Sequence, residues 1–383
     1  MKLFHISDIH IGKILHHYNL IDDQKYILRE IVKKVQEEQP QVMLISGDIY
    51  DKSVPSAEAM SLFDLFLRDL HRANKEMKIL IIAGNHDSGE RLSYAANFLE
   101  SQDIYIVGTP PKNKEDFMKK VVLEDEYGKV NFYLLPFFKP AYVKGALEED
   151  GLSYDEAFAR LIEREEIDYS SRNVLLAHQF FVAGEEKPIT SDSEIKNVGG
   201  LDNIDVKYIK QFDYVALGHI HRNQKVGYDY IRYCGSPLKY SVSEAGHKKA
   251  LVKVLLKEKG KIEIEENLLR PKRDLKALKG ALTDFTSQQE GQFDKDKESY
   301  VSITLTDTTE LFKPKEQLEN VFRNILEIKV DNEITRSLLE DETIKDLEQS
   351  PSELFANFFR EMQGRDLTKE EIEIIEGYIN ETY

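Results

Sequence analysis

The chain has 383 residues, of which 41% are hydrophobic and 32% charged, and this is enough for two or three domains with a full core. Its formal net charge of -17 argues against a protein that coats nucleic acid nonspecifically, because phosphate contacts need clustered cations. No apolar run approaches the roughly 20 residues that cross a bilayer, and the first residues lack the pattern of a secretory signal. The lone Cys234 cannot form an internal disulfide, so we expect a protein of the reducing cytoplasm.

Strand-like apolar runs alternate with amphipathic helical stretches over about the first 265 residues. Residues 23–39 carry apolar side chains at helical spacing, and residues 56–73 repeat that pattern behind Ser56, which suits a helix N-cap. The alternation predicts βαβ units and an α/β fold. Other predicted segments are strands at residues 130–135 and 250–256 and exposed helical structure at 142–171.

The pattern changes at residues 270–273, a basic stretch that indicates a domain boundary. A strand, a helix and a strand are then predicted, at residues 299–306, 314–323 and 326–330. Beyond residue 350 a helical stripe of apolar side chains follows, and Thr368 with Glu371 forms a capping box. We therefore expect three parts, residues 1–268, 269–340 and 341–383.

Five of the apolar runs end in residues that can bind a metal ion. Short apolar runs bounded by Gly or polar residues are typical of buried strands, and ligands in such folds gather beyond the carboxyl ends of the strands. The side chains at these ends are oxygen donors and imidazoles, namely Asp8, His10, Asp48, Asn85, His178, His219 and His221. Such a set suits manganese, iron, zinc or magnesium rather than a structural thiolate zinc site.

Seven donors are too many for one ion in an open catalytic site, but they suit two ions that share a carboxylate. Asp48 stands alone at its strand end and is the natural bridge. Two ions roughly 3.5–4 Å apart can activate a water and hold the phosphoryl oxygens of an in-line displacement. His86 is placed to steady charge on the phosphoryl group or to protonate the leaving oxygen. Asp87 could orient His86, although a cap or turn role is favoured, and His17 could touch substrate or lie in a solvated loop.

A single pair of this kind is weak evidence, since 10 His in 383 residues give a His-x-His pair by chance about 0.3 times. All five sets in order, each at a strand end, are a strong signal. They resemble the calcineurin-like metallophosphoesterase superfamily, whose pattern is Asp-x-His, Gly-Asp, Gly-Asn-His-Asp/Glu, a lone His and Gly-His-x-His. The match covers about the first 240 residues and implies a β-sandwich flanked by helices, followed here by a small α+β capping domain and a helical tail.

Within this superfamily the chain resembles the nuclease subunits that work with an SbcC-type, SMC-like ATPase in bacteria. The supporting segments are residues 10–13, 20–26, 47–51, 218–221 and 234–237. The resemblance implies one ion on Asp8, His10, Asp48 and His221. It implies a second ion on Asp48, Asn85, His178 and His219. His86 would act on the phosphodiester, and the preferred ion would be Mn²⁺.

One departure concerns Asp51, which stands where related archaeal and eukaryotic repair nucleases carry a His. Details of exonuclease action that depend on that His are therefore not carried over. Asp51, Asp87 and His17 are expected around the metal ligands or near the substrate rather than among the ligands.

The resemblance also implies partners. The domain at 269–340 would bind and orient DNA, while the tail would dock on the ATPase coiled coil through Leu354, Phe355, Phe358 and Phe359, unless that stripe packs within the chain. A homodimer within a heterotetramer would form through helices that carry Phe63, Leu67, Leu92 and Phe98, although core packing explains each of these equally well. The basic side chains that could touch DNA, or simply line a solvated linker, are Arg270, Lys272, Arg273, Lys276 and Lys279.

The leading hypothesis is a cytoplasmic, nucleoid-associated two-metal DNA nuclease. It would act as a double-strand exonuclease and a hairpin or single-strand endonuclease, together with the ATPase, in DNA end processing and repair. A second hypothesis uses the same site on a small phosphoester or nucleotide, and the residues after the catalytic domain argue against it. A third is a scaffold for DNA ends and the ATPase, against which the complete donor set argues.

Overall fold

The computed structural model describes residues 1–194, 201–287, 293, 296–309, 311–331, 355, 359–360, 365–368 and 371–372. The chain forms two compact units, the first of residues 1–276 and 298–300, the second of 277–297 and 301–383. The expected division into three parts stays a prediction, because most of residues 341–383 lie outside the described residues. Within the described ranges, no helix is both long enough and apolar enough to span a bilayer.

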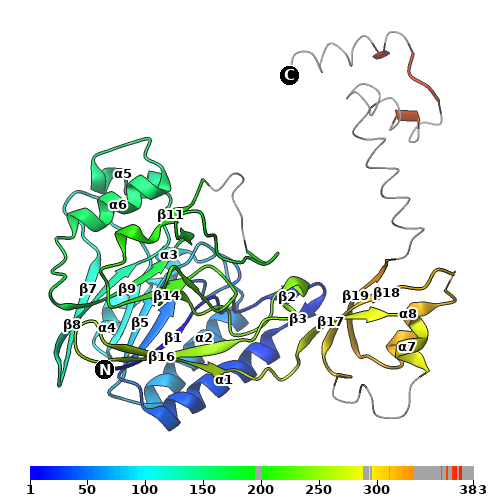
Figure 1. Cartoon of the computed structure of the whole chain (residues 1–383), viewed down its shortest axis with the longest axis horizontal. Helices are drawn as coiled ribbons and strands as arrows, with labels where there is room; N and C mark the ends of the chain where they lie inside the picture. Colours follow the sequence, from blue (N-terminus) through cyan, green and yellow to red (C-terminus); the bar gives the residue numbers. More distant parts are fainter. Residues whose placement is uncertain are drawn as a thin grey trace. The chain divides into compact units, whose positions relative to one another are not determined.

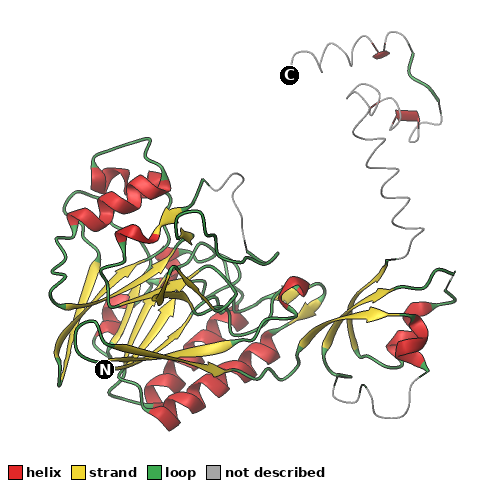
Figure 2. Ribbon diagram, viewed as in Figure 1, coloured by secondary structure: helices red, strands yellow, loops and turns green. Residues whose placement is uncertain are grey.

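The first unit contains two six-stranded sheets (Figure 2). The first sheet has the order β16-β15-β1-β4-β5-β6, in which β1, β4, β5 and β6 are parallel and β15 and β16 are antiparallel to their neighbours. Its strands are β1 (Lys2–Ile6), β4 (Val42–Ser46), β5 (Lys78–Ile82), β6 (Ile104–Val107), β15 (Ala250–Leu256) and β16 (Ile262–Leu268).

The second sheet has the order β13-β14-β12-β9-β8-β7. Its four inner strands are parallel, and β13 and β7 pair antiparallel at the two edges. The strands are β7 (Lys119–Asp125), β8 (Gly128–Leu135), β9 (Arg172–His178), β12 (Tyr214–Gly218), β13 (Gln224–Val226) and β14 (Tyr228–Tyr233). β9 and β12 are buried along their whole length, and burial on both faces explains the apolar runs of residues 174–177 and 215–217 at their centres.

The two sheets pack face to face over one apolar core, to which β4 contributes Val42 and Leu44 and β9 contributes Val174 and Leu176. Helices α1 (Ile21–Glu38) and α2 (Ala57–Ala73) run side by side along the first sheet (Figure 1). The Ser56 side chain accepts a hydrogen bond from Ala59 N at 3.2 Å, so the predicted N-cap is confirmed. The outer face of the second sheet packs against α5 (Pro140–Leu147) and α6 (Tyr154–Arg164). The expected β-sandwich flanked by helices is thus confirmed.

Shorter elements complete the first unit. They are the β2–β3 hairpin (Ile14–Leu15, Tyr18–Asn19), α3 (Gly89–Leu92), α4 (Ala96–Glu100), the β10–β11 pair (Phe181–Val182, Ile204–Asp205) and the 3-10 turns η2 (Val206–Tyr208) and η3 (Val242–Glu244). The helical stretch expected at residues 142–171 is confirmed as α5 and α6, but Phe158 and Leu161 bury the apolar face of α6 in the core.

The second unit is built on a three-stranded sheet of order β17-β18-β19. The predicted strand–helix–strand sequence is present, and a further strand and helix precede it. The elements are β17 (Leu275–Gly280), α7 (Leu282–Thr286), β18 (Tyr300–Leu305), α8 (Pro314–Glu319) and β19 (Asn324–Val330). Apolar side chains from α7, α8 and β18, including Phe285, Val301 and Leu318, form its core.

Candidate metal centre

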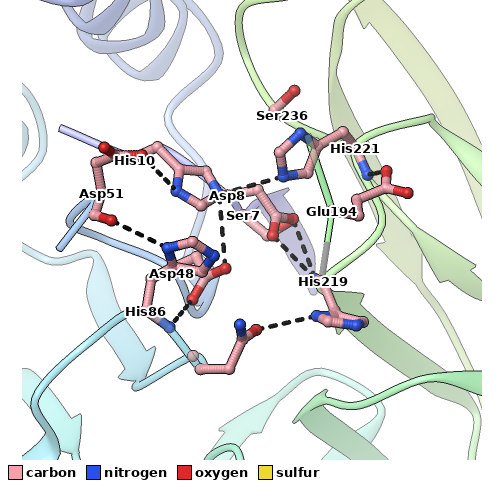
Figure 3. Close-up of polar contacts among 12 residues, drawn as sticks. Ser7, Asp8, His10, Asp48, Asp51, His86, Glu194, His219, His221 and Ser236 are labelled. Atoms are coloured by element: carbon pink, nitrogen blue, oxygen red, sulfur yellow. Dashed lines mark hydrogen bonds and ion pairs between the residues drawn. The ribbon is translucent and has the colours of Figure 1, made fainter. Parts of the chain in front are cut away.

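The carboxyl ends of five parallel strands carry the seven predicted donors, and the structure brings these side chains together. Figure 3 shows Asp8, His10, Asp48, His219 and His221 turned toward one another. Strands of both sheets contribute, and a hydrogen bond of 2.7 Å from His178 Nδ1 to the Ser46 carbonyl joins the sheets at this point. The donors are Asp8 and His10 after β1, Asp48 after β4, Asn85 after β5, His178 at the end of β9, and His219 and His221 after β12.

Asp8, His10 and His221 form the first group, in which one donor atom of each lies within 4.8 Å of the others. The two imidazoles face each other through their Nε2 atoms, 3.1 Å apart. Their Nδ1 atoms face outward, that of His221 to Ser193 Oγ at 2.8 Å and that of His10 to Asp51 Oδ1 at 3.6 Å. Two ring nitrogens at this distance can share one N–H, or can both turn their lone pairs to a metal ion, and all three side chains are buried.

Asn85, His178 and His219 form the second group beside Asp48. Asn85 Oδ1 lies 3.1 Å from His178 Nε2 and 3.0 Å from His219 Nδ1. In neutral His178 the proton is on Nδ1, because the carbonyl of Ser46 can only accept it. The lone pair of Nε2 therefore faces this group.

Asp48 joins the two groups through a single oxygen. Its Oδ2 lies 3.5 Å from His10 Nε2 and 3.4 Å from His178 Nε2. Its other oxygen, Oδ1, accepts a hydrogen bond of 2.9 Å from the backbone N–H of His86. The carboxylate is 2% exposed and so has little contact with solvent.

Four of the donors adopt backbone conformations that are rare outside glycine. The φ angles are 51° at Asp8, 48° at His10, 51° at Asp48 and 100° at His219. Such residues cost about 1–3 kcal/mol each and persist where the surrounding structure imposes them, most often at functional sites. The strand ends are thus bent sharply enough to turn these side chains toward one another.

Two glycines allow the loops to approach the donors closely. A Cβ at Gly47, where φ is 90°, would lie 2.3 Å from His178 Nδ1. A Cβ at Gly84 would lie 2.1 Å from Asp48 Oδ1 and 2.4 Å from Asp48 N. Neither position can hold a larger side chain unless the Asp48 or His178 group moves.

His86 sits beside this centre with one nitrogen already engaged. Its Nδ1 is 3.0 Å from the backbone carbonyl of Asp51, and its ring packs edge-on against His10 at 4.7 Å between centroids. Because a carbonyl only accepts, Nδ1 carries a proton, and Nε2 is the nitrogen left to exchange one with a substrate. The Asp51 carboxylate pairs with Lys13 Nζ at 2.9 Å.

Asp87 and His17 occupy different surroundings. The Asp87 carboxylate accepts hydrogen bonds of 2.9–3.1 Å from the backbone N–H groups of Ile49, Tyr50 and Gly84, so it braces the turns that carry Asp48 and Asn85. Burial, followed by the charge of Asp48, raises the pKa of Asp87 to about 6. His17 is exposed at the turn of the β2–β3 hairpin, where its ring lies 4.1 Å from that of Tyr18.

The pKa shifts of the buried groups reflect burial and the charges of Asp48 and His178. Burial lowers the pKa of His178, but the charge of Asp48 and its hydrogen bond outweigh this and raise the pKa to about 9. Burial raises the pKa of Asp48, yet the charge of His178 outweighs it and holds the pKa well below its usual range. Burial, and then the charge of His178, lowers the pKa of His219 to about 3, so this ring is neutral. A divalent ion can supply the charge that these carboxylates attract.

Comparison with known proteins gives the family. A family model described as calcineurin-like phosphoesterase matches residues 1–223, and one described as type 5 capsule protein repressor C-terminal domain matches residues 271–363. The SbcD subunit of the nuclease SbcCD from Staphylococcus epidermidis is 32% identical over 376 residues, which cover 96% of this chain and 95% of that protein. The chain belongs to the calcineurin-like phosphoesterase family, in the group of the SbcD nucleases.

Two solved structures are also similar, each at 14% identity. A dimetal phosphatase from Danio rerio has a TM-score of 0.41, with 70% of this chain and 95% of that chain covered. The phosphopantetheinyl hydrolase of Mycobacterium tuberculosis has a TM-score of 0.35, with 61% and 87% covered.

As a member of this phosphoesterase family, the chain is a metal-dependent phosphodiesterase. Divalent ions serve the family, and the donor chemistry here fits them. Buried carboxylates and imidazoles converge with the half-buried amide of Asn85, and the Nε2 atoms of His10 and His221 lie 3.1 Å apart.

Four residues around His221 escaped the sequence reasoning, namely Ser193, Glu194, Glu244 and Lys249. These residues lie 23 to 28 positions from His221 in the sequence, so their contacts with it depend on the tertiary fold. Their one sequence signal is a Lys directly before the strand-like run 250–256, which alone is not informative.

The residues predicted to contact a second copy of the chain or DNA differ in how far they are exposed. Phe63, Leu67 and Leu92 are buried within the chain and Phe98 is 72% exposed, so core packing accounts for the first three. Arg273 is neither a free cation nor a linker residue, since its guanidinium pairs with the buried Asp23.

Of the tail stripe, Leu354 and Phe358 lie outside the described residues. Phe355 is 41% exposed, and the Phe359 ring lies 4.9 Å from the Arg365 guanidinium. The predicted capping box is present, because Thr368 and Glu371 exchange side chain to backbone hydrogen bonds of 2.8 and 3.3 Å.

Proposed function

We propose that the chain is a two-metal DNA nuclease. Asp8, His10, Asp48 and His221 would hold one ion, and Asp48, Asn85, His178 and His219 the other. The observation that carries the proposal is the position of Asp48 Oδ2, which lies within 3.5 Å of an imidazole from each group. Two ions there would supply the positive charge that activates a water and stabilises the phosphoryl oxygens.

The side chains of this protein have separate roles around that chemistry. Asp48 is fixed by the His86 N–H, and the Asp87 carboxylate braces the loops on either side of it. His86 keeps its Nδ1 proton on the Asp51 carbonyl, which leaves Nε2 to hold or release a proton toward the phosphodiester or the leaving oxygen. The donors other than Asn85 are buried, which limits the access of bulk water to them.

DNA as the substrate is supported by the relative named a nuclease subunit, which matches nearly the whole chain, and by the second unit, which a minimal phosphatase does not need. We propose Mn²⁺ as the ion, as the resemblance implies, since the oxygens of Asp8, Asp48 and Asn85 suit it. The partner would be an SbcC-type ATPase, with the Phe355 and Phe359 segment docking on its coiled coil, and two copies of the chain would form a dimer within the complex.

The test is cleavage of a DNA hairpin and of duplex ends by the purified chain with Mn²⁺, with and without the ATPase. The proposal expects cutting that needs the metal and that the ATPase stimulates. Absence of cleavage in both cases at full metal occupancy contradicts it. Faster turnover of a nucleotide monoester than of DNA would instead favour an enzyme of small phosphoesters.

A further inference from the structure

Within the described part of the chain, every polar atom of His221 except Nε2 is held by groups outside the donor set. Its backbone N–H donates to Glu194 Oε1 at 2.7 Å, and its carbonyl accepts from Lys249 Nζ at 2.8 Å and from Ser236 N at 3.2 Å. Its Nδ1 lies 2.8 Å from Ser193 Oγ and 3.3 Å from Glu244 Oε1. This leaves Nε2, which faces His10, for an ion.

The groups that hold His221 are centred on a buried ion pair. Lys249 Nζ lies 2.5 Å from Glu244 Oε2, and Glu244 is 0% and Lys249 6% exposed. The three N–H bonds of the ammonium go to Glu244, to Ser236 Oγ at 2.7 Å and to the His221 carbonyl. Burying two charges costs desolvation free energy that their attraction often does not recover, so stability alone does not explain this ion pair. Its contacts with His221 indicate a second role.

The hydrogen-bond directions around the pair determine which nitrogen of His221 is protonated. The Glu244 carboxylate, paired with a cation, only accepts, so the hydroxyl of Ser193 donates to it. Ser191 Oγ is 3.1 Å from Ser193 Oγ, but its own proton goes to Glu194. Ser193 Oγ therefore accepts from His221 Nδ1–H, which leaves the Nε2 lone pair free.

We propose that Glu244 and Lys249 are positioning residues for His221. Through Ser193 they hold the imidazole in the tautomer that can bind an ion, and they thereby set the occupancy of one of the two metal positions. The inference rests on the proposed function for the existence of two ions. It adds residues that lie beyond the last of the five donor motifs.

The substitution Glu244→Gln changes the directions of the hydrogen bonds around Ser193. The new amide turns its oxygen to the Lys249 ammonium and its NH₂ to Ser193, so the Ser193 hydroxyl loses its acceptor on Glu244, and His221 Nδ1 and Ser191 Oγ are the acceptors left to it. When the hydroxyl donates to His221 Nδ1, the imidazole carries its proton on Nε2, where it blocks the ion. We expect Mn²⁺ affinity at the position shared with Asp8 and His10 to fall by about 10–100-fold, with the other position unchanged.

A second variant is needed because Glu244→Gln leaves the buried Lys249 ammonium without its carboxylate and could disturb folding. In Glu244→Met/Lys249→Met both charges are replaced by apolar side chains of similar size, a change that buried ion pairs often tolerate. The Ser193 hydroxyl then has His221 Nδ1, at 2.8 Å, and Ser191 Oγ, at 3.1 Å, as its acceptors, and a loss of the same ion is expected. The matched control is Asp125→Asn, which breaks another buried ion pair, with Arg172, in the same unit.

The measurements are Mn²⁺ titration calorimetry, electron paramagnetic resonance and melting of the metal-free protein. We expect the spectrum of a coupled Mn²⁺ pair in the wild type and the control, and that of an isolated ion in both Glu244 variants. Excess Mn²⁺ should restore kcat on bis(p-nitrophenyl) phosphate. Wild-type affinity at both positions in either variant, or equal loss of both ions with unchanged melting, overturns the inference. If the wild type binds two ions but cuts no DNA, only the proposed function fails, since the titration still decides this inference.

Discussion

Replacing Gly84 by Ala tests whether the position of Asp48 controls the centre. The added Cβ would lie 2.1 Å from Asp48 Oδ1, 2.4 Å from Asp48 N and 2.7 Å from Asp48 Cγ. Since non-bonded carbon and oxygen atoms need more than about 3 Å, either the carboxylate or the Gly84 loop must move by about 1 Å. A shift of this size costs about 10²-fold in rate, and overpacking costs about 1–3 kcal/mol of stability.

The assay follows hydrolysis of bis(p-nitrophenyl) phosphate at saturating Mn²⁺, together with the bound Mn²⁺ per chain and the free energy of unfolding in urea. Gly246→Ala is the matched control, because nothing lies within 4 Å of a Cβ at that position and its φ is not positive. We expect the control to match the wild type in all three measurements. Wild-type rate and metal content in Gly84→Ala would show that Asp48 can shift without consequence and would refute the reasoning.

Two further substitutions separate chemistry from folding. His86→Ala should keep both ions, because His86 holds Asp48 through its backbone N–H alone, but kcat on DNA should fall by about 10²–10⁴-fold; loss of metal in this variant would contradict that role. Asp125→Asn should lower the free energy of unfolding by about 3 kcal/mol at pH 7, measured in urea, because it removes the carboxylate that pairs with the buried Arg172 guanidinium and with the N-terminal ammonium. Burial raises the pKa of Asp125, but the hydrogen bond from Arg172 outweighs it and holds the pKa at about 2. The stabilisation that the Asp125 carboxylate gives is therefore complete above about pH 4 and should disappear as pH falls toward 2. A difference in unfolding free energy between wild type and variant that does not change with pH would be evidence against this explanation.

The sequence predicted the strand ends because their pattern is local. Asp8, Asp48 and Asn85 each follow a short apolar run, and parallel strands bring such ends to one edge whatever the connections between them. The predicted helix boundaries agree closely with the structure for the same reason, and α2 begins directly after its N-cap Ser56.

What the sequence could not predict depends on contacts between distant segments. The Glu244–Lys249 pair reads as ordinary surface charge until η3 and β15 place it against His221. Phe63 and Leu67 were equally compatible with a core or an interface, since periodicity shows that a face is apolar and not what covers it. The extra strand β17 is half Lys and Gly, so its composition hides its place in the sheet of the second unit.

Metal content and hairpin cleavage measured together on the wild type and on Asp48→Ala test the central claim most directly. Asp48 Oδ2 lies within 3.5 Å of imidazoles from both groups, so its loss should empty both metal positions and abolish cutting together. A variant that keeps two Mn²⁺ per chain, or that cuts the hairpin at the wild-type rate, would contradict a shared two-metal centre.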